Sequence, residues 1–153
     1  MLKVLLLQGA NGNYLRRREP SVYGSTTVDE LDGLLHQHAQ DRGYSLEVFY
    51  TNIEGEAINR IYRAVDEGFD GLVMNPAGFS YAGYALKDCV KSAALPYVEI
   101  HISNIHKRGI NCVLSDASEG VITGFGVYGY LLALDAMLNR LNQRATSAAA
   151  QSG

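Results

Sequence analysis

One stretch of the sequence, residues 96–106 (PYVEIHISNIH), combines an apolar run with groups that move protons or bind anions. Apolar side chains alternate there with Glu99, His101 and Ser103, which is the period of two of a β-strand. Glu99 and His101 therefore share a strand face, where a carboxylate can orient an imidazole for proton transfer. The alternative is a half-buried strand whose outer face is merely polar.

Polar side chains also follow two other predicted strands. The apolar run over residues 2–7 leads to Asn11 and Asn13, and the run over residues 71–74 leads to Asn75. Ligands of open parallel sheets bind at the carboxyl ends of the strands. We therefore expect these amides to meet the groups of the fourth strand around one crevice, which favours a site over a bland polar surface.

The elements that must position these residues alternate between strands and helices. Strands are predicted over residues 2–7, 45–50, 71–75, 96–103 and 120–124, and helices over 28–42, 57–65, 81–94 and 127–141. Such alternation predicts βαβ units and a parallel sheet. The pattern favours an α/β protein, a flavodoxin-like three-layer sandwich with a five-stranded parallel sheet in the order 2-1-3-4-5.

This single domain is predicted to span residues 1–142. Residues 143–153 lack an apolar face and are expected to form a disordered tail. The segment from residue 14 to 25, which contains Arg16, Arg17 and Arg18, is predicted to be a long loop that closes over the crevice. His36 and His38, near the end of the following helix, are expected at the surface.

Composition excludes several classes of protein. The chain has 153 residues, 47% of them hydrophobic, and a formal charge of −3, so it lacks the basic stripe of a nucleic-acid-binding protein. The opening apolar run is too short for a signal peptide or a membrane span. Cys89 and Cys112 have no metal or redox spacing and are expected to be reduced, consistent with a cytoplasmic protein.

Several common kinds of chemistry are also absent from the sequence. The loop after the first strand has neither the lysine of a P-loop nor the glycine spacing of a dinucleotide fingerprint. Ser103 lacks the context of a nucleophile elbow, and no lysine lies in an apolar strand. We therefore expect neither a cofactor nor a metal ion.

Two long motifs resemble those of the type II dehydroquinases, or 3-dehydroquinate dehydratases. The family's fourth strand reads V-E-V-H-[LI]-S-N-[IV]-H-x-R, and residues 98–108 read VEIHISNIHKR. Its first loop reads N-G-P-N-x-x-x-L-G-x-R-E-P-x-x-Y-G, which residues 8–24 match in large part. The similarity extends over residues 2–141. It implies the loss of water from 3-dehydroquinate through an enolate, without a cofactor, in the shikimate or quinate pathway.

The resemblance also implies roles for individual residues. Tyr23 matches the tyrosine that removes a proton beside the substrate ketone, and Arg18 the arginine that favours the phenolate form of that tyrosine. His101 matches the acid that protonates the leaving hydroxyl, and Glu99 the carboxylate that orients it. Asn11 matches the residue that holds the enolate oxygen through water.

Substrate binding and assembly follow from the same resemblance. The backbone N–H groups of Ile102 and Ser103 match a nest for the substrate carboxylate, and Asn75 matches a contact to the substrate hydroxyls. Tyr81 occupies a further substrate-binding position. The resemblance implies a homo-oligomer, a dodecamer made of trimers, in which Asp88 reaches the site of a neighbouring subunit.

The chain departs from the family pattern at three places. Tyr81 stands where the family has a histidine, the first loop begins Gln8-Gly9-Ala10-Asn11, and the arginine expected after Arg108 is missing from a shortened segment. The proton-transfer set is kept, whereas the groups that recognise the substrate ring are altered. Three hypotheses remain: a 3-dehydroquinate dehydratase, a lyase or isomerase acting on a related hydroxy-ketone acid, and a non-catalytic homologue that binds a small molecule.

Overall fold

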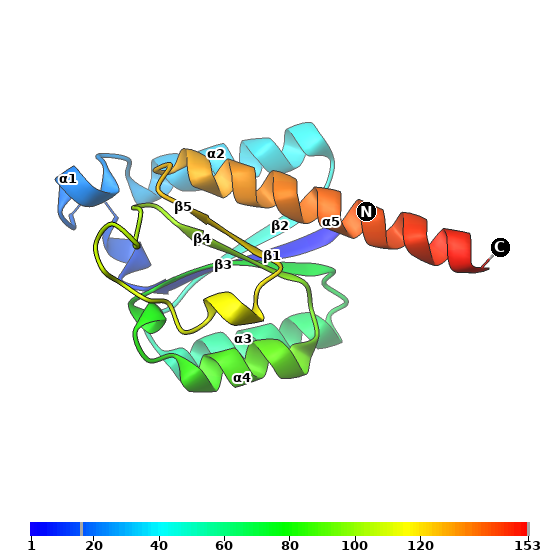
Figure 1. Cartoon of the computed structure of the whole chain (residues 1–153). Coiled ribbons are helices and arrows are strands. Elements are labelled where there is room, and N and C mark those ends of the chain that lie inside the picture. Colours follow the sequence, from blue (N-terminus) through cyan, green and yellow to red (C-terminus); the bar gives the residue numbers. More distant parts are fainter. Residues whose placement is uncertain (16, 153) are drawn as a thin grey trace.

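A computed structural model describes residues 1–15 and 17–152 (Figure 1). Its five strands form one parallel sheet in the order β2-β1-β3-β4-β5, which confirms the predicted order. The strands are β1 (Lys3–Ala10), β2 (Ser45–Tyr50), β3 (Gly71–Ala77), β4 (Tyr97–His101) and β5 (Gly120–Thr123).

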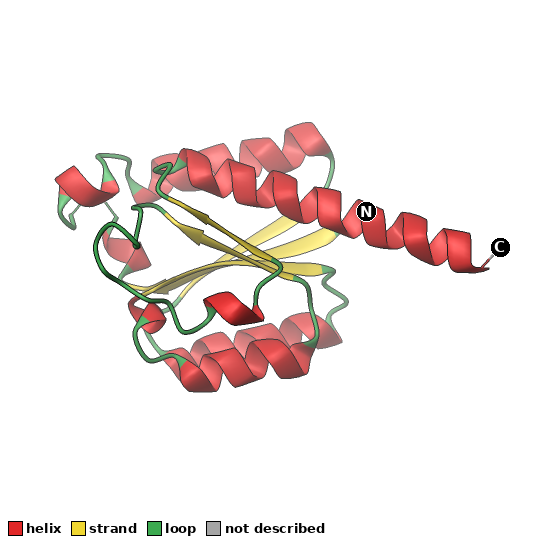
Figure 2. Ribbon diagram, in the orientation of Figure 1, coloured by secondary structure: helices red, strands yellow, loops and turns green. Residues whose placement is uncertain are grey.

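Helices cover both faces of the sheet and give the predicted three layers (Figure 2). The helices are α1 (Pro20–Tyr23), α2 (Val28–Arg42), α3 (Glu54–Asp66), α4 (Tyr84–Ala93) and α5 (Tyr128–Ser152), with short 3₁₀ turns η1 (Gly12–Tyr14), η2 (Gly78–Ser80) and η3 (Ser115–Ala117). α2 begins at the N-cap Thr27 and ends at Gly43, whose φ of 72° suits glycine. Among the described residues, no helix is both long enough and apolar enough to cross a bilayer.

The core is divided by the sheet into two halves. On β1, Val4 and Leu6 pack with α2 and α5, whereas Leu5 and Leu7 pack with α3 and α4. Because both faces of β1 are covered, every position of its middle must be apolar, which explains the unbroken run at the start of the chain. The loops at the carboxyl ends of the strands are left free to form a site.

Two predicted segments have more helix than expected. The region from residue 14 to 25 is not a structureless loop, because α1 begins at Pro20, a residue suited to the first turn of a helix. The predicted disordered tail is also wrong for residues 143–152, which continue α5 beyond the sheet (Figure 1). This exposed stretch is rich in alanine and has no helix-breaking residue, so local propensity favours the helix without a buried face.

Two further predictions need correction. His38, expected at the surface, is only 8% exposed. Its two ring nitrogens form hydrogen bonds with the Tyr44 hydroxyl and with the Asp135 carboxylate, each at 2.8 Å. These partners give a buried imidazole the hydrogen bonds it needs, and Asp135 lies on α5, far along the chain. The predicted helix from residue 81 begins instead at Tyr84, because η2 precedes it.

Candidate active site

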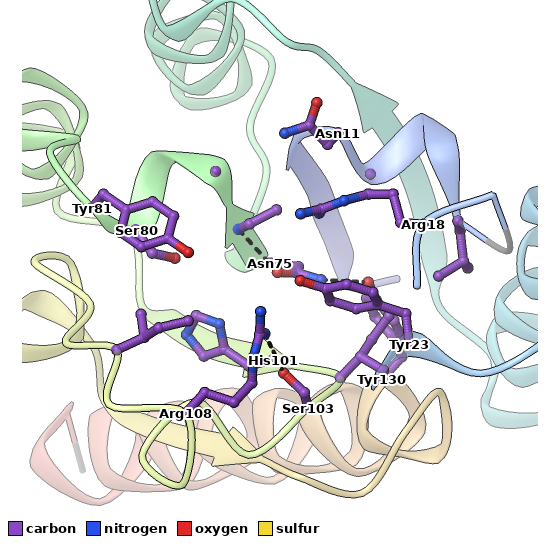
Figure 3. A pocket seen from close by; sticks show the side chains of 16 residues that line it. Asn11, Arg18, Tyr23, Asn75, Ser80, Tyr81, His101, Ser103, Arg108 and Tyr130 are labelled. Carbon is purple, nitrogen blue, oxygen red and sulfur yellow. Dashed lines mark hydrogen bonds between the residues drawn. The ribbon is translucent and has the colours of Figure 1, made fainter. Parts of the chain in front are cut away.

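A pocket lies at the carboxyl ends of β1, β3 and β4 (Figure 3). Eight of the ten predicted site residues line it: Asn11, Arg18, Tyr23, Asn75, Tyr81, His101, Ile102 and Ser103. They come from segments far apart in the sequence, and the order of the strands brings them together as predicted.

The other two predicted residues lie outside the pocket wall. Glu99 is 0% exposed and lies behind His101. Asp88 is exposed on α4 and does not line the pocket. All five residues of β4 are buried, so the alternative of a strand with a polar outer face is wrong.

The Glu99 carboxylate is surrounded by hydrogen-bond donors. It accepts from the hydroxyl of Tyr97 at 2.7 Å, from the ring Nε2 of His101 at 2.9 Å and from the Cys112 thiol at 3.4 Å. The Ser115 hydroxyl also donates to it. A buried carboxylate is tolerated where such donors replace water, and this one has four.

These contacts set the ionisation of the pair. Burial alone acts to raise the pKa of Glu99, but hydrogen bonds from His101, Ser115 and Tyr97 outweigh burial and lower it. Burial also acts to lower the pKa of His101. Hydrogen bonds with Cys112 and Glu99, and the charge of Glu99, instead raise the pKa of His101 to about 9. His101 is therefore an imidazolium at neutral pH, the form that donates a proton.

Tyr23 lies between two cations. The guanidinium carbon of Arg18 is 4.7 Å from the centre of its ring, and that of Arg108 is 5.4 Å away. Tyr23 is the last residue of α1, so the segment predicted as a lid positions this side chain over the pocket (Figure 3). Arg16, part of the arginine run in that prediction, lies outside the described residues.

The two asparagines of the pocket are held by different means. Asn11 has a φ of 74°, a left-handed conformation that asparagine tolerates, and its N–H donates to Oδ1 of Asn52 at 2.7 Å. Asn75 accepts from the N–H of Ala77 at 3.0 Å and donates to the hydroxyl of Tyr130 at 2.8 Å. Asn13, which the sequence also placed at this edge, does not line the pocket.

Sequence reasoning missed several residues of the site. Arg108 and Tyr130 line the pocket, and Arg108 donates to the Ser103 hydroxyl at 2.9 Å. Cys112 and Ser115 complete the donors around Glu99. Arg108 is the last residue of the motif that begins at Val98, so the sequence did contain a feature that could have identified it as a site residue. Cys112 and Ser115 had none, because their contacts with Glu99 depend on how the segment after β4 folds back.

Three of these residues also have the chemistry of metal ligands. Glu99, His101 and Cys112 place potential ligand atoms within 4.8 Å of one another. The hydrogen bonds around Glu99 already account for this cluster in the structure. The absence of a metal ion and a cofactor therefore stays a prediction from the sequence.

Fold and site together define an α/β protein with a cationic pocket suited to acid–base chemistry on an anionic ligand. The family model described as dehydroquinase class II matches residues 2–138, and the chain belongs to this family. The resemblance inferred from the two motifs is thereby confirmed.

Individual relatives agree with this assignment. The chain is 42% identical over 142 residues to a 3-dehydroquinate dehydratase of Thioalkalivibrio sulfidiphilus, covering 91% of this chain and 97% of the relative. It is 40% identical over 146 residues to 3-dehydroquinate dehydratase 1 of Pseudomonas aeruginosa, covering 94% and 99% of the two chains.

Similar solved structures also agree with the family assignment. A type II dehydroquinase from Butyrivibrio crossotus superposes with a TM-score of 0.86 at 31% identity, covering 89% of this chain and 97% of that one. A 3-dehydroquinate dehydratase-like protein from Bifidobacterium longum gives 0.69 at 34% identity, covering 93% and 99%.

Proposed function

We propose that this protein is a type II 3-dehydroquinate dehydratase, which eliminates water from 3-dehydroquinate to give 3-dehydroshikimate. The observation that supports this most directly is one pocket containing Tyr23 between two guanidinium groups and a charged His101 backed by Glu99. A base and an acid in different protonation states are what an elimination through an enolate requires.

Tyr23 is the proposed base. As a phenolate it takes a proton from the carbon beside the ketone, and the electrons of that C–H bond form an enolate. The positive charges of Arg18 and Arg108 lie close to the ring and stabilise the negative charge on the phenolate. Asn11 follows β1 directly and lines the pocket, which supports its proposed role of holding the enolate oxygen through water.

His101 is the proposed acid in the second step. The enolate re-forms the ketone, a carbon–carbon double bond forms, and the C–O bond to the leaving hydroxyl breaks. The imidazolium gives its proton to that hydroxyl, which departs as water. Glu99 keeps the ring charged and oriented, because its carboxylate faces Nε2 from inside the sheet.

The remaining pocket residues are proposed to bind the substrate. The backbone at Ile102 and Ser103 would receive the carboxylate, and Asn75 would contact a hydroxyl. Arg108 hydrogen-bonds Ser103 and lines the same pocket, so we propose that it supplies the cation that the shortened segment after it lacks. Tyr81 lies at the rim with 62% of its surface exposed.

Assembly into a dodecamer made of trimers is part of the proposal. Asp88 is exposed and lies away from its own pocket, as a residue serving a neighbouring subunit would. Sedimentation of the native protein tests this arrangement. A stable monomer would contradict it.

A related hydroxy-ketone acid is the second candidate substrate. The exposed Tyr81 and the missing arginine after Arg108 alter ring recognition, while Tyr23, His101 and Glu99 keep the proton-transfer chemistry. A substrate with the same carboxylate and ketone but different hydroxyls would use the same acid and base.

Incubation with 3-dehydroquinate while the enone absorbance of the product is followed tests the main proposal. We expect turnover, and we expect Tyr23→Phe and His101→Ala each to abolish it. The absence of a signal at high enzyme concentration would remove 3-dehydroquinate as the substrate. Ligand-induced thermal stabilisation that survives Tyr23→Phe, without turnover, would indicate a binding protein.

A further inference from the structure

A buried chain of side-chain hydrogen bonds runs from the pocket into the core. The Nδ2 of Asn75 donates to the hydroxyl of Tyr130 at 2.8 Å, and that hydroxyl donates to Oε1 of Gln8 at 2.7 Å. The three residues belong to β3, α5 and β1, and each is 7% exposed or less. The Asn75 amide and the Tyr130 hydroxyl lie side by side at the pocket (Figure 3).

The direction of these bonds is fixed at both ends. The backbone N–H of Ala77 can only donate, so Oδ1 of Asn75 must face it, as it does at 3.0 Å. Oε1 of Gln8 can only accept, so the Tyr130 hydroxyl must donate to it and is left to accept from Asn75. If the Asn75 amide were flipped, its NH₂ group would face the N–H of Ala77, and two donors cannot bond each other. Its oxygen would face a Tyr130 hydroxyl that already donates to Gln8, so both hydrogen bonds of Asn75 would be lost.

A second tyrosine, which is half-buried, lies on the strand beside Gln8. Gln8 and Tyr50 are partners on the neighbouring strands β1 and β2, so the Tyr50 side chain belongs to the surroundings of Gln8. The Tyr50 hydroxyl donates to Oδ1 of Asp32 at 2.8 Å. Since a carboxylate only accepts, Asp32 fixes the direction in which the Tyr50 hydroxyl points.

Both tyrosines keep their protons at neutral pH. Burial raises the pKa of Tyr130 to about 12, and the hydrogen bond that its hydroxyl accepts from Asn75 offsets this only in part. Burial, together with the hydrogen bond to Asp32, raises the pKa of Tyr50 well above its ordinary value. The Tyr130 hydroxyl therefore remains a donor to Gln8 throughout the working pH range.

We infer that Tyr130 and Gln8 are positioning residues that hold the Asn75 amide in one orientation, with its NH₂ group on the Tyr130 side and its oxygen on the Ala77 side. The substrate then meets a fixed donor rather than an amide free to turn over. Asn75 thereby selects a ligand with an oxygen acceptor at that position. This inference rests on the proposed function, since Asn75 is taken to contact a hydroxyl of 3-dehydroquinate.

The substitution Tyr130→Phe removes the link between Asn75 and Gln8 while keeping the aromatic ring in the core. We expect KM for 3-dehydroquinate to rise about 10-fold with kcat within about 2-fold, because losing one oriented hydrogen bond weakens binding by about that factor. In the Asn75→Ala background, the same substitution should change KM less than about 2-fold. If Tyr130 had a purely structural role, Tyr130→Phe would instead change KM by the same factor in the wild-type and Asn75→Ala backgrounds.

Tyr44→Phe is the matched control. Tyr44 is also a buried tyrosine with a side-chain partner, His38 at 2.8 Å, and it does not line the pocket. Both variants should lower the melting temperature, but Tyr44→Phe should leave KM unchanged. Gln8→Met, which removes the acceptor of the Tyr130 hydroxyl at a similar side-chain volume, provides a second variant in case Tyr130→Phe folds poorly, with KM raised about 3-fold.

The outcomes separate this inference from the proposed function. A wild-type enzyme that neither binds nor dehydrates 3-dehydroquinate would overturn both. An active wild-type enzyme with an unchanged KM in Tyr130→Phe, or in Gln8→Met where only that variant folds, would overturn the positioning role alone. A rise in KM that is equally large in the Asn75→Ala background would also overturn it.

Discussion

Nε2 of His101 lies 2.9 Å from Oε2 of Glu99, and both side chains are buried at the carboxyl end of β4. Burial alone favours the neutral imidazole, yet hydrogen bonds with Cys112 and Glu99, and the charge of Glu99, raise the pKa of His101 to about 9. β4 thus carries an acid, the His101 imidazolium, that stays charged at neutral pH. Its partner, the Glu99 carboxylate, stays ionised because other donors hydrogen-bond to it.

Glu99→Gln tests this relationship through the pH profile. Since the acid must be protonated, wild-type activity should fall on the alkaline side near pH 9. Without the charge of Glu99, this limb should move toward the ordinary histidine value of about 6.5. At pH 7 only about a quarter of the enzyme would then carry a protonated imidazole, so activity there should drop about 4-fold from the loss of charge alone.

Glu119→Gln is the control for that experiment, because it removes a carboxylate that pairs with the exposed Arg144. Its pH profile should match that of the wild type. An alkaline limb that stays near pH 9 in Glu99→Gln would show that Glu99 does not keep His101 charged.

The stability of the fold should also depend on pH through His101. Its pKa is raised in the folded state, so the native protein binds more protons than the unfolded chain between about pH 6.5 and 9. The stabilisation is complete below pH 6.5 and is lost as the pH rises through 9, by on the order of 3 kcal/mol. Urea unfolding at pH 6.5 and 9.5 measures the loss, which His101→Asn should remove. Equal losses in both proteins would contradict the assignment.

The sequence was sufficient to predict the sheet order and the meeting of the strand ends. Continuous apolar runs identify strands covered on both faces, and the alternation with helices leaves few topologies. Once the order was set, Asn11, Asn75 and His101 had to lie at one edge. These are consequences of local pattern and connectivity, which a sequence contains.

The contacts made by the segment after β4 were beyond reach of that reasoning. Arg108 donates to Ser103 because tight turns over residues 105–109 reverse the chain, and Cys112 reaches Glu99 because the segment after these turns folds back toward β4. Cys112 has no spacing that marks it as part of a site. The helical continuation beyond residue 142 has no apolar face that would mark it in the sequence, and only its alanine content favours a helix there.

Arg108→Ala tests the cation proposed for substrate binding. Removing a charge-assisted contact should raise KM for 3-dehydroquinate roughly 10- to 100-fold. Arg108→Lys should recover part of the affinity, because a lysine keeps the charge but not the planar fork. Arg63→Ala, on α3 and away from the pocket, is the control. A KM as low as that of the wild type in Arg108→Ala would remove Arg108 from the binding site.

Ala77→Gly tests whether the pocket stores backbone strain. Ala77 follows Asn75 and Pro76 with φ at 48° and ψ at −120°, a conformation that costs a residue with a Cβ about 1–2 kcal/mol but suits glycine. Glycine also gives the unfolded chain more conformational freedom, which costs the variant about 0.5–1 kcal/mol of stability. Relief of strain exceeds this cost, so the variant should be more stable than the wild type by about 0.5–1 kcal/mol. Its N–H still donates to Asn75, so kcat and KM should stay within about 2-fold of the wild type. Ala85→Gly, in the exposed part of α4, should instead destabilise by about 1 kcal/mol in the same urea titration. Equal destabilisation by the two substitutions would show that Ala77 is unstrained.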